Sequence, residues 1–487
     1  MMPVLTLLLL AMLASSVLCI AIRRSPLISS VMPACAFVLL LLAIVLCIPV
    51  LDGNVIDDGV FWMDPLSAVF MMLVAVIGFI ASLYSRAYIG MDLREHEISH
   101  NDNGTYYSLL IVFISVMMLT FTARSMAVVW LGVGATTLVS TFLVGFYSRE
   151  ESTEAAWKYI ILCSVGITIA LFGLTLVYAS TVGIIDSDSA LDWPQLMLHA
   201  SELDPNMMRM ATILIIIGFG TKVGFVPMHT WLPDAHSQAP SPVSGLLSAV
   251  LLNCAMYAIL RFYGVSEVLD PGFASTVMLI FGFVSLAAAA FFIVSSRDLK
   301  RMLAYSSIEN MGLIAIGFGI GTPVAIAAAI MQMTAHSITK PILFFSAGNL
   351  IQAYGTRAMA GIRGAGKAMP FTAFAMAAGT LAIVGCPPFA VFVGELSLMI
   401  GALESGMVIE VALMVVLLAI VFAGMVRNVF PMLTGEPPEG IGDLREPSRT
   451  IPIAVLIILS LCIGLFMPEQ AMTWIENAAS AVTGGFI

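Results

Sequence analysis

Long runs of apolar residues, separated by short polar segments, follow one another along the whole chain. About 20 consecutive apolar residues are enough for an α-helix to cross a bilayer. Fourteen runs reach about that length, at 3–22, 31–50, 61–84, 106–123, 126–147, 157–180, 207–226, 241–262, 275–295, 302–320, 323–350, 370–402, 408–431 and 451–467. The pattern predicts an all-α polytopic membrane protein with about 14 transmembrane helices.

Three of these runs contain or meet residues that interrupt helices. Pro227 and Pro233 follow the run at 207–226, Lys340-Pro341 lies within 323–350, and Gly385-Cys386-Pro387-Pro388 lies within 370–402. A helix break at membrane depth is tolerated where the freed backbone lines a protein interior or a watery cavity. We therefore expect breaks at these points, and broken helices are typical of ion paths in transporters.

The order of spans and breaks suggests an internal repeat. Two sets of five spans, 106–263 and 275–432, each carry a proline-broken fourth span with one charge, Lys222 before Pro227 and Glu395 after Pro388. Five-helix units that start on opposite sides of the membrane are inverted repeats. We expect this pair of repeats to be preceded by three helices in 1–105 and followed by a helix and a tail in 433–487.

Composition agrees with the hydropathy pattern and excludes several classes of function. Hydrophobic residues make up 60% of the chain and charged residues 10%, against about 25% charged residues in soluble domains. The net charge of −10 is spread over loops, so we expect a lipid bilayer and no nucleic acid as a partner. The seven cysteines show no CxxC spacing, so neither a metal site nor an iron–sulfur cluster is expected in this chain.

Basic residues predict the orientation of the chain. With both termini outside, the loops and helix ends on the inside hold fifteen Lys and Arg, namely Arg23, Arg24, Arg86, Arg94, Arg149, Lys158, Arg297, Lys300, Arg301, Arg357, Arg363, Lys367, Arg427, Arg445 and Arg449. The outside holds three, Arg124, Arg209 and Arg261. An excess of this kind marks the cytoplasmic side, so we expect a multi-pass protein of the inner cell membrane.

Ionisable residues inside the apolar runs are the candidate functional groups. Five lie at depth, Lys222, Glu309, His336, Lys340 and Glu395, and three more follow the first break, His229, Asp234 and His236. Such residues are costly in a membrane and usually face a cavity or a partner. A row of lysine, histidine and carboxylate groups can pass protons where water bridges them. The alternatives are a snorkelling Lys222 on a kinked packing helix, and a hydrogen-bonded structural pair at His336 and Lys340.

Three segments carry a family resemblance, KVGFVPMHTWLPDAHSQAPSPVS, RDLKRMLAYSSIENMG and HSITKPILFFSAGNL. They resemble the antiporter-like membrane subunits shared by respiratory complex I, Mrp-type cation/proton antiporters and membrane-bound [NiFe] hydrogenases. Within that family, SSIEN and the stretch WKYIILCSVGITIALFG most resemble the F subunit of complexes of the hydrogenase-4 and formate hydrogenlyase type. The resemblance implies proton translocation coupled to other membrane subunits and a peripheral redox arm. It implies that partner subunits carry iron–sulfur clusters and a [NiFe] or similar centre, while this chain binds no cofactor.

The resemblance also assigns roles to particular positions. Lys222 matches the family's seventh-helix lysine, His336 and Lys340 its eleventh-helix pair, and Glu395 its twelfth-helix charge. Where the family has a fifth-helix glutamate before ATTL, this chain has Gly134, and where some relatives have an eighth-helix lysine it has Asn253. Both departures predict a weak or silent first half.

Two further functions remain open from the sequence. Behind a subunit of a hydrogenase-like or complex I-like oxidoreductase, the alternatives are an Mrp-type cation/proton antiporter and the membrane half of an inorganic-carbon uptake system. The residues do not distinguish protons from Na⁺ as the coupled ion.

Overall fold

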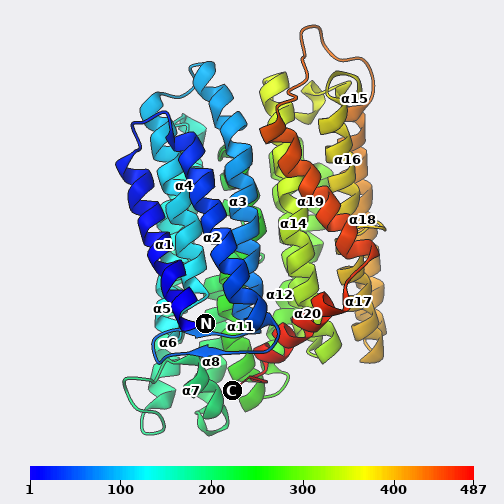
Figure 1. Ribbon diagram of the computed structural model, residues 1–487. Coiled ribbons are helices and arrows are strands. Elements are labelled where there is room, and N and C mark those ends of the chain that lie inside the picture. Colours follow the sequence, from blue (N-terminus) through cyan, green and yellow to red (C-terminus); the bar gives the residue numbers. More distant parts are fainter. Residues whose placement is uncertain (487) are drawn as a thin grey trace.

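The computed structural model describes residues 1–486 as a bundle of long helices that stand side by side (Figure 1). Twelve are long and apolar enough to cross a membrane. They are α1 (Met2–Ala21), α2 (Ile28–Leu51), α3 (Pro65–Arg94), α4 (His100–Thr120), α5 (Met126–Val144), α6 (Glu150–Thr181), α8 (Pro205–Val223), the continuous helix Ser241–Leu269, α12 (Phe273–Ser295), α13 (Leu299–Ile320), α18 (Val408–Leu433) and α19 (Pro447–Leu465).

The other two predicted spans correspond to one continuous long helix and to one pair of helices separated by a break. One is α14 (Pro323–Tyr354), and the other is the pair α16 (Pro370–Ile383) and α17 (Ala390–Glu404). Short elements complete the described part of the chain: β1 (Ile56–Asp57) paired antiparallel with β2 (Trp62–Met63), α7 (Trp193–Leu198), η1 (Ala200–Glu202), α9 (Trp231–Gln238), η3 (Met359–Gly361), α15 (Ala365–Ala368) and α20 (Glu469–Val482).

The expected break at Lys340-Pro341 is wrong, because α14 continues through Pro341 without interruption. Proline removes one backbone donor and leaves the carbonyl four residues earlier without its helical partner. Here the helix around the proline is fully buried and is held from both sides by side-chain hydrogen bonds. Tertiary contacts therefore keep the helix intact at a position where the local sequence favours a stop.

The other two expected breaks are present. The first helix ends at Val223, and Gly224 follows with φ +90°, a left-handed conformation that glycine adopts without steric cost. The chain then resumes as α9. In the second case α16 ends at Ile383 and α17 begins at Ala390. Each break therefore divides its helix into two parts, with a charged residue close to the interruption.

The loops divide the bundle into two ends. We call the end with the loops 145–149, 296–298, 355–369 and 434–446 the basic end, and the opposite end, with 52–64, 121–125 and 182–204, the acidic end. The first broken helix runs from the acidic to the basic end and the second runs the other way. Both termini lie toward the acidic end (Figure 1). The side of the membrane that each end faces stays a prediction.

The tail predicted after the last span contains a helix, α20, which the hydropathy pattern missed. It crosses the acidic end of the bundle and packs against α3 and α14 (Figure 1). Asp52 accepts hydrogen bonds from Trp474 (2.8 Å) and Gln470 (2.6 Å), which tie the helix to the end of α2. Two of its own side chains, Ile475 and Val482, are buried. An amphipathic helix of this kind is too short and too polar to register as a span.

A buried ion pair holds α3 to the helix Ser241–Leu269. Arg261 donates to both carboxylate oxygens of Asp64, at 2.6 and 2.8 Å, and its guanidinium lies 4.2 Å from the ring of Trp193. Both charged side chains are at most 1% exposed. The sequence placed Arg261 at an exposed helix end. The side chain instead turns inward, because Asp64 supplies a partner that charge counting along the chain cannot reveal.

Candidate functional site

The predicted histidine–lysine pair lies at the centre of the bundle, between α14 and α13. The Lys340 amine donates to the Leu303 carbonyl at 2.8 Å and to the Ser306 hydroxyl at 2.6 Å, both on α13. His336, one turn earlier on the same face of α14, has its Nε2 3.2 Å from the Ser248 carbonyl. All of these side chains are fully buried, so snorkelling to either surface is excluded for this lysine.

A π-helical turn supplies the carbonyls that face α14. The continuous helix consists of α10 (Ser241–Leu246), the π-turn η2 (Leu247–Leu251) and α11 (Leu252–Leu269). Besides Ser248, the Ala249 carbonyl accepts from the Ser337 hydroxyl at 2.8 Å. Asn253 in turn donates to Ser337 at 2.7 Å. Turns of this kind are rare and are frequent at functional sites. At the position where some relatives have a lysine, an uncharged amide thus completes the contact with α14.

Glu309 lies on α13 beyond the lysine and is fully buried. Its Oε2 accepts from the Asn310 amide at 2.5 Å, and Asn310 accepts from Gln332 at 2.8 Å, so α13 and α14 are joined by an amide chain. The charges of Glu309 and Lys340 attract one another. Glu309 Oε1 has no hydrogen-bond partner, which leaves this buried carboxylate with unused acceptor capacity.

Glu395 lies on α17 just after the second break and is 6% exposed. It is close enough to Glu309 for like-charge repulsion, and its Oε1 is also without a partner. The break wraps around this carboxylate, since a Cβ at Gly385 would come within 1.9 Å of its Oε2. The break therefore provides the space in which the Glu395 carboxylate sits.

Lys222, at the end of α8, is buried but lies apart from this group. Its amine donates to three acceptors on α5, the Val133 carbonyl (2.8 Å) and the hydroxyls of Thr136 (2.7 Å) and Thr137. No carboxylate bonds to it among the described residues. A Cβ at Gly134 would touch only Ile167, at 3.9 Å. Helix packing does not require glycine at this position.

The three residues after the first break take separate places. His229 packs beside Phe292, and burial lowers the pKa of this imidazole below its ordinary value, which keeps it neutral. Asp234 is near the surface of the basic end, where it pairs with Lys158 (3.1 Å) and Arg301. Of the three, His236 alone is fully buried and lies within electrostatic reach of His336 and Lys340.

The predicted residues thus divide into two groups. His236, His336, Lys340, Glu309 and Glu395 form one succession of neighbouring ionisable groups, which we call the central row. Lys222, His229 and Asp234 stand outside it. The amides that connect the row, Asn310 and Gln332, were not predicted. Only their presence as polar residues within apolar runs could have signalled them.

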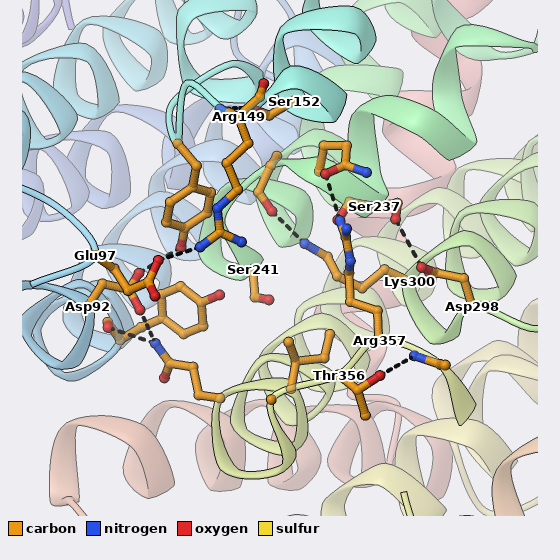
Figure 2. Close-up of a pocket in the computed structure, with 18 of the residues that line it drawn as sticks. Asp92, Glu97, Arg149, Ser152, Ser237, Ser241, Asp298, Lys300, Thr356 and Arg357 are labelled. Carbon is orange, nitrogen blue, oxygen red and sulfur yellow. Dashed lines mark hydrogen bonds and ion pairs between the residues drawn. The ribbon is translucent and has the colours of Figure 1, made fainter. Parts of the chain in front are cut away.

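A polar pocket of about 570 Å³ opens at the basic end, between α3, α6, α13, α14 and the turn that joins α9 to α10 (Figure 2). Asp92, Arg149, Arg357 and Lys300 are among the residues that line it. The sequence placed Lys300 among the basic residues of the inside loops and helix ends. It is instead 3% exposed and donates to the Ala239 carbonyl. Among residues 1–486, no group of three or more His, Cys, Asp or Glu is placed to hold a metal ion.

Comparison with known proteins identifies the fold and the family. The family described as "NADH:quinone oxidoreductase/Mrp antiporter, TM" matches residues 123–422, and "NADH-Ubiquinone oxidoreductase (complex I), chain 5 N-terminus" matches residues 58–96. The first match covers more than half of the chain and includes the central row.

Two relatives match over most of their length. The hydrogenase-4 component F homolog of Methylacidiphilum infernorum is 35% identical over 426 residues, which is 86% of this chain and 88% of that protein. NADH-quinone oxidoreductase subunit N of Desulforudis audaxviator is 30% identical over 434 residues, 85% of this chain and 83% of that protein.

Two solved structures share the fold. A chain of the membrane-bound sulfane sulfur reductase (MBS), an archaeal respiratory membrane complex, superposes with a TM-score of 0.88 at 22% identity, covering 98% of this chain and 97% of that one. A chain of the Mrp complex from Dietzia sp. DQ12-45-1b gives a TM-score of 0.86 at 22% identity, covering 98% and 96%.

Proposed function

From the premise that this chain belongs to the family of antiporter-like membrane subunits found in NADH:quinone oxidoreductases, hydrogenases and Mrp-type complexes, we propose that it moves protons across the membrane for a redox complex of the hydrogenase-4 type. The long match to the hydrogenase-4 component F homolog supports that type. In this proposal the chain has fourteen spans and two inverted five-helix repeats. Other membrane subunits and a peripheral arm with iron–sulfur clusters and a [NiFe] or similar centre carry the electron transfer.

The central row is the single observation that carries this proposal. Its members are buried where charge is expensive, and structural hydrogen bonding would not require several of them together. Along the row, four atoms have no hydrogen-bond partner: His236 Nε2, His336 Nδ1, Glu309 Oε1 and Glu395 Oε1. Buried water binds where several polar atoms converge. Water between these atoms would complete a path on which protons pass from group to group.

Lys340 has the central role in this path. It is the lysine of the row and lies within electrostatic reach of Glu309, and its amine is held by a carbonyl and a hydroxyl, both neutral. The amine can store a proton that arrives from His336 and pass it to Glu309. The protonated amine and the Glu309 carboxylate together have no net charge, and after the transfer both groups are neutral. Repulsion between Glu309 and Glu395 disfavours charge on both carboxylates together, so a proton on one favours release from the other.

The first repeat contributes less in this proposal. The Lys222 amine is held by three neutral acceptors on α5, and the position of the family glutamate is occupied by Gly134. Lys222 therefore has no carboxylate on α5 with which it could form and break an ion pair. Lys340, by contrast, has Glu309 nearby. Transport then depends on the second repeat.

Substitution of Glu395 tests the proposal in the intact complex. Glu395→Gln, reconstituted in proteoliposomes with its partner subunits, should lose redox-driven proton uptake, and Glu395→Asp should retain part of it. Glu404→Gln is the matched control, because Glu404 lies on the same helix and is exposed. If Glu395→Gln assembles and pumps protons normally, Glu395 has only a structural role and the proposal is refuted.

Two arrangements compete with this one, a subunit of an Mrp-type antiporter and the membrane half of an inorganic-carbon uptake system. Identification of the proteins that co-purify with the chain separates them: hydrogenase subunits, Mrp subunits, or one large zinc-binding protein. Repeating the flux measurement with Na⁺ in place of a proton gradient identifies the coupled ion.

Orientation in the inner membrane follows from the charge bias. We propose that the basic end faces the cytoplasm and that both termini lie outside. Single cysteines at Arg363 and Asp188 should react with impermeant thiol reagents from opposite sides, and labelling at Arg363 from the outside would reverse the assignment.

A further inference from the structure

We propose that the polar pocket at the basic end is the inlet through which protons reach the central row, and that Lys300 passes them from the pocket to His236. The inference rests on the proposed function, since it supplies the entrance to the same path. Neither Lys300 nor the pocket was identified from the sequence as part of that path.

The pocket reaches from the surface of the basic end to the first turn of α13. Figure 2 shows Lys300 extending from that turn toward the middle of the pocket, with Ser241 and Arg357 nearby. With a volume of about 570 Å³, the pocket has room for many water molecules, since each occupies about 30 Å³ in the liquid. Polar side chains from six helices, α3, α6, α9, α10, α13 and α14, line it, so it suits water better than an apolar ligand.

Lys300 differs from the other cations of the pocket. Arg149 pairs with Glu97, and Arg357 donates to the Ser237 carbonyl (3.0 Å) and the Gln238 amide (2.7 Å). An arginine stays charged under all physiological conditions and cannot hand on a proton. Among residues 1–486, Lys300 has only the Ala239 carbonyl as a hydrogen-bond partner. A buried lysine amine with one neutral partner can both release and accept a proton.

Three of the four acidic residues that line the pocket are already engaged, Glu97 by its pair with Arg149, and the fourth, Glu95, is exposed. The Asp92 carboxylate accepts from the Tyr147 hydroxyl and the Gln352 amide, each at 2.6 Å. Asp298 caps α13 and accepts from Ser237 at 3.3 Å. Neither carboxylate pairs with Lys300 among the residues that the structure describes. The lysine is therefore the buried charged group of the pocket that remains available for exchange.

His236 connects Lys300 to the row. It lies one turn before Ala239, whose carbonyl holds the lysine, and the charges of Lys300 and Lys340 both act on its ring. The His236 Nδ1 is 2.8 Å from the Leu232 carbonyl, while Nε2 is buried and has no partner. The ring also interacts with His336. Nε2 can take a proton from the Lys300 side through water and release the same proton through water on the His336 side, while Nδ1–H stays bonded to the Leu232 carbonyl.

Lys300 could instead only fasten the turn between α9 and α10 to α13. Lys300→Arg separates the two roles, because arginine keeps the charge and the hydrogen-bond donor but cannot release a proton. If Lys300 passes protons, Lys300→Arg should assemble, and its rate of redox-driven proton uptake should fall at least tenfold. If Lys300 only holds the turn to α13, the uptake rate of Lys300→Arg should stay within a factor of two of the rate of the unsubstituted complex. That result would overturn the proposal.

Chemical rescue covers the case in which Lys300→Arg does not assemble. In Lys300→Cys, treatment of the complex with 2-bromoethylamine rebuilds an amine of nearly lysine length on the thiol. Proton uptake should rise at least fivefold in the treated variant. Arg297→Cys, on the exposed side of the same turn, is the control and should not respond. Failure of the rebuilt amine to restore uptake, with modification verified by mass spectrometry, would also overturn the proposal.

Blocking the pocket gives a second, independent readout. Thr356 is partly exposed and lines the pocket (Figure 2). A bulky thiosulfonate on Thr356→Cys should reduce uptake at least threefold, whereas the same label on Arg363→Cys, at the same end but outside the pocket, should not. Equal uptake in both labelled variants would count against an inlet here.

Measuring Glu395→Gln in parallel keeps the two proposals apart. Loss of uptake in Glu395→Gln with full uptake in Lys300→Arg refutes the inlet and leaves the proposed function intact. Full uptake in Glu395→Gln refutes the proposed function itself.

Discussion

A single methyl group at Gly385 should disable the carboxylate of Glu395 without removing it. The Cβ of Gly385→Ala would lie 1.9 Å from Glu395 Oε2, whereas atoms in contact are normally separated by about 3.5 Å. The carboxylate oxygen must therefore move by roughly 1.5 Å. Since the obstructing atom is the end of a flexible side chain, we expect Glu395 to move while the chain still folds.

The left-handed backbone at Gly385, with φ +69°, adds a second cost. A non-glycine residue in this conformation costs about 1–2 kcal/mol. Gly406→Ala is the matched control, because Gly406 has φ +76° and open space around its Cβ. The two variants should lose similar thermal stability, so a difference in transport between them reports on the position of the carboxylate alone.

Transport is measured as redox-driven acidification of proteoliposomes that contain the intact complex. A misplacement of about 1 Å at a reacting group can cost about 100-fold in rate, so we expect Gly385→Ala to transport roughly 10- to 100-fold more slowly than Gly406→Ala. Equal rates in the two variants, at equal assembly, would show that the observed position of Glu395 is not needed for proton transfer.

Two further substitutions test the first repeat and the buried ion pair. Gly134→Glu should assemble, because a Cβ there meets only Ile167 at 3.9 Å, and should increase proton flux through the first repeat; unchanged flux in a fully assembled variant would contradict a missing partner for Lys222. Arg261→Met leaves Asp64 buried and unpaired, and should destabilise the complex by about 3–5 kcal/mol, while Arg209→Met, from an exposed pair with Asp270, should cost about 1 kcal/mol or less. Thermal melts of the two variants compare these values directly, and equal melting points would contradict the role given to the buried pair.

The sequence predicted the burial of Lys222, Glu309, His336, Lys340 and Glu395, but not which of them meet. Lys222 and Glu395 stand out because apolar residues flank them and prolines follow or precede them, a signal that is local in the chain. The contact of Lys340 with Ser306 joins positions 34 residues apart, and no periodicity encodes it. The same limit explains Lys300, whose burial depends on a turn about 60 residues earlier in the chain.

Local rules also failed where tertiary structure outweighs them. Pro341 reads as a helix stop, yet side-chain hydrogen bonds from α14 to α13 and to η2 keep the helix intact around it. Arg261 reads as an exposed charge at a helix end, yet Asp64 draws it inward. The helix α20 was missed because its apolar face is narrow, although Trp474 and Ile475 mark it in retrospect.

One helix, α13, supplies a contact at every stage of the path. Lys300 begins it, the Leu303 carbonyl and Ser306 hold Lys340, Ser307 meets Ser248 at 2.8 Å, and Glu309 follows. Residues of a helix are fixed relative to one another at about 1.5 Å and 100° per position. A small rotation or slide of α13 would therefore change all of these contacts at the same moment. The inlet and the carboxylate end of the row are therefore coupled through one rigid helix. A partner protein that rotated α13 would open or close the path along its whole length.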